Sequence, residues 1–441
     1  MIKNFLPEFL LSMYIIAALI SRKARLPNGS LIFIAAIPAC CFCEESAKTN
    51  FLLHNVTLLK IMLLLGGSVI SRLMKNDSFE NRLLMTCSIL GSLLVVSANN
   101  FILLFFSVQL MIIPACRLIG RDDPGFRRIF FLSCILRSLL LAAAIGFIYF
   151  SLKATSFGDI RYLISFSEID QNFLLLSILI LASLPLRFGF SPENSFAFRI
   201  LREKISNAAL IYCVAYPAAL IVFYRITANV FGNFGGRNLL LSAGLILSAS
   251  AAVQLPFQNN LKKIIACAVT SHVGTIFMCC AFPCYNSANA VIFSTASEMI
   301  SLLGIFVLLD EVKKNKYSEI ENIQHLNSLQ NRHPILALSI FALFLSLFGF
   351  PPFLGFQSRF YLFSAMVENF SMLMIYAATL IPNLICIIKI SEALWFKKNN
   401  DIFIFDEGTG KITGFLASLT IIAIPIIFMM LQTINNYMYF T

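Results

Sequence analysis

The sequence predicts an all-α, polytopic membrane protein with about fourteen transmembrane helices. Hydrophobic residues make up 59% of its 441 residues, charged residues make up only 12%, and phenylalanine occurs 44 times. This is more apolar surface than a soluble domain buries. Apolar stretches of roughly 17–25 residues, the length of a helix that crosses a bilayer, recur along the chain. They lack the period-2 alternation of barrel strands, so the spans are predicted to be helices.

Polar loops divide these apolar stretches into spans. The first stretch lacks a basic start and a small-residue cleavage site, so we interpret it as helix one and not as a removed signal. No loop is long enough for a separate soluble domain, so residues 1–441 are predicted to form a single membrane domain. The spans are expected near residues 5–21, 29–43, 54–71, 83–98, 101–116, 129–150, 172–190, 206–226, 238–255, 264–283, 289–309, 334–350 continuing toward 366, 370–394 and 412–436.

The positive charge of the chain follows the loops. The formal net charge is +11, but Lys and Arg concentrate in alternate loops, with 22 in the odd-numbered loops and 6 in the even-numbered loops and the N-terminal segment. Positive charge near the ends of spans is retained on the cytoplasmic or matrix side. The pattern predicts an even number of spans with both termini outside. It also accounts for the charge without a nucleic-acid partner.

The sequence shows no motif that would hold a cofactor or a metal. Its 12 cysteines include runs such as Cys40, Cys41 and Cys43 in or beside apolar stretches, without the Cys and His spacing of zinc or iron–sulfur sites. Glycine-rich nucleotide loops are also missing. We therefore expect this chain to bind no cofactor or metal itself, and we expect any redox chemistry to belong to partner subunits.

Several short motifs occur in one order along the chain, and together they resemble one family. They are Leu6-Pro7-Glu8, Ser97-Ala98-Asn99-Asn100, Asn260-Leu261-Lys262-Lys263 with Ser271-His272-Val273-Gly274, and Leu345-Ser346-Leu347-Phe348-Gly349-Phe350-Pro351-Pro352 with Gly355-Phe356 and Arg359-Phe360-Tyr361-Leu362-Phe363. This pattern resembles subunit N of NADH-quinone oxidoreductase (respiratory complex I), the counterpart of mitochondrial subunit 2. That family belongs to the antiporter-like proton-translocating subunits.

The resemblance implies a specific architecture. Two inverted five-helix repeats are expected, spans four to eight (about 83–226) and spans nine to thirteen (about 238–394), with broken helices in spans seven and twelve. Pro185 and Pro192 in span seven, and Pro351-Pro352 in span twelve, give a physical reason for the breaks, since proline removes an N–H and clashes with the preceding turn. Broken helices commonly line polar pathways, although kinked helices without a transport role would show the same prolines.

Ionisable residues inside the spans are costly and are therefore candidates for function. Lys389 and Glu392 lie one helical turn apart, which favours an ion pair within one helix. His272 has two interpretations, a proton carrier or a side chain that simply bonds a neighbouring span. The other ionisable residues in the spans are Lys60, Arg137, Arg187, Glu298 and Arg359.

The chain departs from the proton-carrying residues that the family implies. Gln109 takes the place of the glutamate of span five, Arg187 that of the lysine of span seven, and Arg359 that of the lysine of span twelve. The span-eight lysine aligns with Tyr216 and the span-six lysine with Ile129 or Arg128. Arginine does not release its proton in a protein and glutamine has none to release, so the usual chemistry is altered.

Two hypotheses about the mechanism remain open at this point. In the first, the subunit still moves protons through His272, Glu298, Lys60 or ordered water, with Arg187 and Arg359 as fixed positive charges. In the second, it is a structural part of the membrane arm that has lost its own proton path. A third hypothesis places the chain in a sodium-type multisubunit cation/proton antiporter, but the Leu6-Pro7-Glu8 start and the Ser97–Asn100 link favour subunit N.

The resemblance also implies partners and a location. Expected partners are the other membrane subunits of complex I and, through them, the hydrophilic redox arm, with NADH, FMN, iron–sulfur clusters and quinone bound elsewhere in the complex. The expected location is the bacterial inner (plasma) membrane as a multi-pass protein, with the mitochondrial inner membrane as the alternative.

Overall fold

The computed structural model describes most of the chain, and the described part is almost entirely helical. One pair of two-residue antiparallel strands, β1 (Lys313–Lys314) and β2 (Phe403–Ile404), is the exception among the described residues. The described residues are 6–20, 29–41, 52–75, 77–119, 124–166, 196–231, 236–311, 313–314, 322–327, 329–332, 334–397, 403–404, 414–415 and 418. The predicted all-α class is confirmed.

The α-helices follow one another along the chain with short connections. In chain order they are α1 (Leu6–Ile20), α2 (Gly29–Cys41), α3 (Leu52–Leu73), α4 (Phe79–Ser97), α5 (Phe101–Leu118), α6 (Pro124–Leu152), α7 (Phe157–Phe166), α9 (Phe196–Arg202), α10 (Ile205–Leu210), α11 (Tyr216–Arg225), α12 (Arg237–Gln254), α13 (Leu261–Ala281), α14 (Tyr285–Glu311), α15 (Leu329–Arg332), α16 (Pro334–Leu347), α17 (Leu354–Met366) and α18 (Phe370–Ser391).

Shorter helical segments extend several of these helices. The π-helical segments η3 (Ile211–Ala215) and η4 (Ile226–Phe231) make one continuous helix with α10 and α11, and η7 (Glu392–Phe396) continues α18. The 3₁₀ segments are η5 (Leu255–Phe257) after α12 and η6 (Ile323–Leu326) before α15.

Eight helical segments of the described part are long and apolar enough to cross a membrane. Each lies where the sequence predicts a span, with ends that differ by a few residues. The predicted span at 172–190 lies outside the described residues, and so does nearly all of the span at 412–436. The ten-residue helix α7 is a difference, because the sequence pattern indicated only a loop between spans six and seven.

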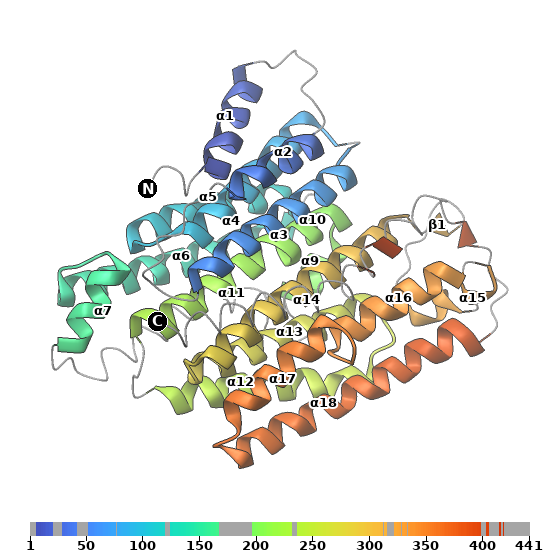
Figure 1. Cartoon of the computed structure of the whole chain (residues 1–441). Helices are drawn as coiled ribbons and strands as arrows, with labels where there is room; N and C mark the ends of the chain where they lie inside the picture. Colours follow the sequence, from blue (N-terminus) through green and yellow to red (C-terminus); the bar gives the residue numbers. More distant parts are fainter. Residues whose placement is uncertain are drawn as a thin grey trace.

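The core lies along α13 and α14 (Figure 1). In an 18-residue apolar stretch of α14 every residue is buried, and in the corresponding stretch of α13 94% of the residues are buried. In the corresponding stretches of α6 and of α18 with η7, only 22% of the residues are buried. Helices α6 and α18 therefore lie at the periphery and turn apolar side chains such as Leu132, Phe150, Ile381 and Ile388 outward. A membrane helix packs its inner face against protein and its outer face against lipid or another subunit.

Two helical hairpins, α4–α5 and α12–α13, share the same local geometry. Asn100 caps α5 by accepting from the N–H of Ile102 at 2.9 Å, and Asn260 caps α13 by accepting from the N–H of Lys262 at 2.9 Å. Each asparagine also forms an isolated antiparallel bridge to the chain that follows the hairpin, Asn100 with Ser156 and Asn260 with Asn322. The α4–α5 and α12–α13 links therefore have the same asparagine cap and the same isolated bridge.

In both hairpins the two helices pack against each other at a glycine. A Cβ added to Gly91 of α4 would lie 2.4 Å from the backbone N of Met111, and one added to Gly244 of α12 would lie 2.7 Å from the carbonyl O of Gly274. Such distances leave no room for a side chain, so the helices approach backbone to backbone. Small residues at crossing points allow this packing between membrane helices.

Candidate functional site

A broken helix lies beside the buried core. Helix α16 ends at Leu347 and α17 begins at Leu354, with Pro351-Pro352 in the interruption, as the sequence predicts for span twelve. The carbonyl groups near the break find protein partners. Ser297 of α14 donates to the carbonyl O of Ser346 at 3.0 Å, and the Leu347 carbonyl faces His272. The predicted break in span seven lies outside the described residues.

Arg359 of α17 extends across the break toward two other elements. A Cβ on Gly349, whose φ is +72°, would lie 2.4 Å from the Arg359 Nε, so glycine makes room for the guanidinium. With its amide oxygen turned toward Arg359, Asn383 of α18 accepts hydrogen bonds from Nη1 and Nη2, each at 3.2 Å. The fixed positive charge is thereby held at the junction of α16, α17 and α18.

His272 of α13 joins α14 to the end of α16. Its Nε2 lies 3.1 Å from the carbonyl O of Leu347, which only accepts, so Nε2 carries the proton. Its Nδ1 lies 3.0 Å from the hydroxyl of Ser294. Arg359 is close enough to His272 for electrostatic repulsion of a second positive charge. His272 therefore bonds neighbouring spans and, at the same time, lies between the broken helix and α14.

Glu298 of α14 is fully buried, and neither carboxyl oxygen has a hydrogen-bond partner among the described residues. It lies one helical turn after Ser294 and interacts electrostatically with the hydroxyls of Tyr212 and Tyr216. The Tyr216 hydroxyl donates to the Val269 carbonyl at 3.2 Å, while the Tyr212 hydroxyl is buried without a described partner. Buried polar groups of this kind are normally satisfied by internal water.

These side chains form one group, which we call the broken-helix cluster. It consists of His272, Ser294, Arg359 and Asn383, which are joined by the contacts above, and of Glu298, which lies one helical turn after Ser294 on α14. The structure thus brings three of the five predicted site residues to the same part of the core.

The other two predicted site residues do not join this cluster. Gln109 of α5 accepts from the Ser138 hydroxyl of α6 at 3.1 Å, and its Nε2 is buried without a partner in the part of the chain that the structure describes. Gln109 therefore belongs to the α5–α6 contact. Arg187 lies outside the described residues.

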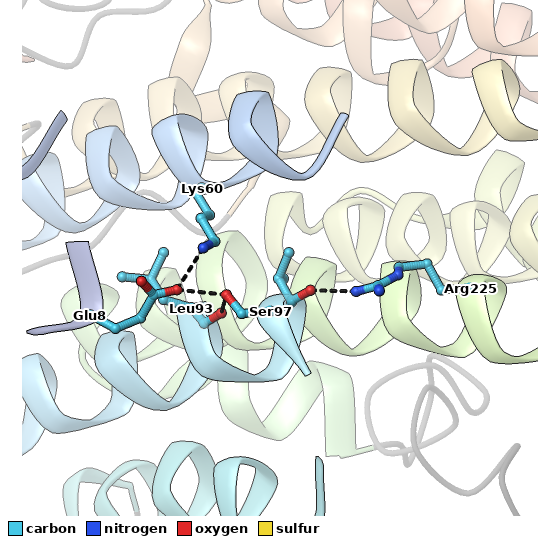
Figure 2. A network of polar contacts seen from close by, with 6 residues as sticks. Glu8, Lys60, Leu93, Ser97 and Arg225 are labelled. Carbon is cyan, nitrogen blue, oxygen red and sulfur yellow. Dashed lines mark hydrogen bonds and ion pairs between the residues drawn. The ribbon is translucent and has the colours of Figure 1, made fainter. Parts of the chain in front are cut away.

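A second polar group involves residues that sequence reasoning did not combine, and we call it the N-terminal cluster (Figure 2). Glu8 of α1 and Lys60 of α3 form an ion pair at 2.8 Å, with both side chains only 3% exposed. Ser97 at the end of α4 lies 2.6 Å from the same Glu8 Oε1. Arg225 of α11 donates to the Val96 carbonyl at 2.5 Å and to Asn99 Oδ1 at 2.9 Å. The sequence feature that could have indicated this pair is one acidic and one basic residue, Glu8 and Lys60, in separate apolar spans.

One predicted ion pair is wrong. Lys389 and Glu392 do not pair; the Lys389 ammonium donates to the Pro256 carbonyl, and Glu392 pairs instead with Lys397 at 3.3 Å. The carbonyl of the η5 turn lies within reach of Lys389 because α18 packs beside α12 and η5. Helical spacing alone does not show such a partner from another element.

Comparisons with known proteins agree with this architecture. The model of the family described as "NADH:quinone oxidoreductase/Mrp antiporter, TM" matches residues 98–384. NADH-quinone oxidoreductase subunit N of Pelagibacter ubique is 25% identical over 441 residues, covering 92% of each chain. Subunit N 1 of Rhizobium meliloti is 22% identical over 396 residues and covers 84% of this chain and 80% of that protein.

Solved structures share the fold. A chain of respiratory complex I from Thermus thermophilus superposes with a TM-score of 0.80 at 15% identity, covering 94% of this chain and 96% of that chain. A chain of the Mrp complex from Dietzia superposes with a TM-score of 0.77 at 14% identity, covering 96% of this chain but 49% of that chain. At such identities, the likeness concerns the fold alone.

Proposed function

Because the chain belongs to the NADH:quinone oxidoreductase/Mrp antiporter transmembrane family, we propose that it is the subunit N component of a proton-translocating NADH:quinone oxidoreductase. The end-to-end similarity to proteins named subunit N carries this proposal, since 92% of the chain and 92% of the Pelagibacter protein align. In this role the chain is a non-redox translocase subunit of the membrane arm. NADH, FMN, iron–sulfur clusters and quinone belong to its partner subunits.

We also propose fourteen spans in two inverted five-helix repeats, spans four to eight and nine to thirteen, within one membrane domain. The matched hairpins support this arrangement. Phe157 donates its N–H to the Asn99 carbonyl at 3.0 Å, and Ile323 donates to the Asn259 carbonyl at 2.9 Å, at corresponding points after α4–α5 and α12–α13. The location that fits is the inner membrane of a bacterium, because the named relatives are bacterial proteins.

The proton path that we propose passes through the broken-helix cluster. Glu298 and His272 have protons that they can exchange, whereas Arg359 keeps its charge and acts as a fixed electrostatic element. The unpartnered oxygens of Glu298 and the nearby Tyr212 hydroxyl, in the part of the chain that the structure describes, support a site that holds water. From there, Ser294 leads to His272 Nδ1, and His272 Nε2 leads to the broken helix. Gln109, at the α5–α6 contact, lies outside this path.

The test of the assignment is purification of the tagged protein from its native membrane in mild detergent. We expect the flavin and iron–sulfur subunits to co-purify and the preparation to reduce quinone with NADH. Recovery with antiporter subunits alone, and without NADH:quinone activity, would instead favour a cation/proton antiporter. An assembled, active complex whose pumping is unaffected by Glu298 and His272 variants would favour a structural subunit.

A further inference from the structure

We propose that Glu8 and Lys60 are a proton-exchanging pair that positions the α4–α5 link and, through Arg225, helix α11. None of these residues lies on the path proposed through His272 and Glu298, and the proposal uses the complex I assignment only for its readout. The supporting observation is that one short stretch, residues 96–99, is bound from one side by Glu8 and from the other by Arg225 (Figure 2).

The geometry of the pair suits proton transfer from Lys60 to Glu8. The Lys60 Nζ lies 2.8 Å from Glu8 Oε1, a hydrogen-bond distance, and both side chains are buried. When a proton passes from the ammonium to the carboxylate, one N–H bond breaks, one O–H bond forms, and the pair becomes a neutral amine and a carboxylic acid. No other reactant is needed. Both ions are removed from water, which is costly for each unless it stays paired.

The free oxygen of Glu8 supports this exchange. Its Oε2 is buried and has no hydrogen-bond partner among the residues described. A buried carboxylate that served only to bind helices would be expected to use both oxygens, because an unsatisfied acceptor is costly. Oε2 is therefore an unused acceptor that can take a proton or bind an internal water molecule.

The second step concerns the Ser97 hydroxyl, which has one proton and two acceptors. Glu8 Oε1 lies at 2.6 Å and the Leu93 carbonyl, one turn back in α4, lies at 2.9 Å. A carboxylate is the stronger acceptor because the bond is charge-assisted. When Glu8 becomes neutral, its bond from Ser97 loses the charge assistance, and the Ser97 hydroxyl donates to the Leu93 carbonyl instead. Ser97 therefore has two discrete states that follow the protonation of Glu8.

The third step connects Ser97 to α11. The Val96 carbonyl, next to Ser97, accepts a hydrogen bond from Arg225. The permanent positive charge of Arg225 is also attracted by the partial negative charge at the C-terminal end of α4. Helix α11 begins at Tyr216, close to Glu298. A change of bonding at Ser97 thus alters the restraint on the helix that carries Tyr216.

Other charged groups do not compete for Glu8 in the described part of the neighbouring helices. Helix α2, which packs on α1, contains no acidic or basic residue. Arg82 lies near the start of α4, at the opposite end from Ser97. Glu80 is exposed at the opposite end of α4. Among the described residues, Glu8 and Lys60 pair with each other, and Arg225 bonds residues 96–99 from the other side.

The proposal is tested on the assembled complex in native membranes with the double variant Glu8→Gln with Lys60→Met. This variant leaves no unpaired charge, and the new glutamine side chain still accepts from Ser97. We expect infrared difference spectra recorded on NADH reduction to lose one carboxyl band that the parent complex shows. The exposed Glu80→Gln control should keep every band. A double variant that assembles with an unchanged spectrum would overturn the exchange.

A second variant tests the positioning role. Ser97→Ala leaves the Glu8–Lys60 pair in place, so the complex should assemble and keep the carboxyl band, while protons pumped per NADH oxidised should fall. Pumping at the parental ratio in Ser97→Ala would overturn the positioning. Loss of NADH:quinone activity in the parent would instead concern the complex I assignment, so the two failures are distinguishable.

Discussion

The two buried polar clusters differ in how their charges are compensated. In the N-terminal cluster, Glu8 meets Lys60 at 2.8 Å and the Ser97 hydroxyl, and Arg225 meets two acceptors. In the broken-helix cluster, Glu298 has no hydrogen-bond partner among the described residues, and His272 and Arg359 repel each other when both are positive. Among the described residues, Glu8 therefore leaves one carboxyl oxygen, Oε2, without a partner, whereas Glu298 leaves both without one.

This difference implies different roles for the two clusters. The paired charges of the N-terminal cluster contribute to the packing of α1, α3, α4 and α11. Removing one of them leaves its partner as an unpaired charge in a medium of low dielectric constant. A buried carboxyl group that makes no hydrogen bond to the described residues, such as Glu298, holds no neighbouring helix in place, so proton exchange is the role we propose for it, whereas Glu8 combines exchange with positioning.

Lys60→Met should destabilise the protein far more than Glu298→Gln. Removing one partner of a buried ion pair typically costs about 3–5 kcal/mol, since the remaining carboxylate is uncompensated. Glutamine at 298 keeps the shape of a protonated glutamate and leaves no partner behind. The measurement is denaturant unfolding of the two variants in detergent. Equal losses of unfolding free energy would contradict the contrast between the clusters.

Alanine at Gly91 and at Gly244 should destabilise the two hairpins by similar amounts. Each added methyl group meets backbone atoms less than 3 Å away, and overpacking of this kind costs about 1–3 kcal/mol. Gly146 of α6 is the matched control because nothing lies within 4 Å of its added Cβ in the described part of the chain. Unfolding measurements should show losses for the first two and none for Gly146→Ala. A large loss in only one hairpin would weaken the proposed repeat.

Gly349→Ala should disturb the broken-helix cluster without affecting the N-terminal cluster. Alanine at a φ of +72° costs about 1–2 kcal/mol, and its Cβ would displace the Arg359 guanidinium. We expect a modest loss of stability together with reduced proton pumping per NADH oxidised in the assembled complex. Normal pumping would show that the position of Arg359 is not important for the path.

The smallest effect is expected for the helix caps. Asn100→Ala and Asn260→Ala each remove a side-chain acceptor at the start of a helix, at a cost of about 1 kcal/mol. Serine at the same positions retains the capping oxygen and should restore most of the stability. Thermal unfolding of the four variants, Ala and Ser at each position, measures these changes in stability. A cost in one hairpin only would show that the two caps are not equivalent.

The sequence allowed the helices and one break to be predicted because these depend on local properties. Apolar length locates spans such as α13 and α14, and consecutive prolines interrupt the helix between α16 and α17. Glu298, His272 and Arg359 were identified for a similar reason, since an ionisable group in an apolar span is unusual wherever it lies.

Pairing between helices was not predictable in the same way. Glu8 and Lys60 lie in different spans, and nothing local indicates that α1 and α3 bring them together at the end of α4. Lys389 illustrates the opposite error, because a favourable spacing within one helix was outweighed by a carbonyl acceptor on η5. Partners of charged side chains depend on how helices pack, which residue spacing does not encode.

The most direct test of the proton path is the ratio of protons pumped to NADH oxidised in a complex that carries Glu298→Gln. The measurement uses native membrane vesicles with confirmed assembly, and Glu80→Gln is the control. We predict a lower ratio for Glu298→Gln, with NADH oxidation retained and the control unchanged. A parental ratio in assembled Glu298→Gln vesicles would contradict the account and assign the broken-helix cluster a structural role.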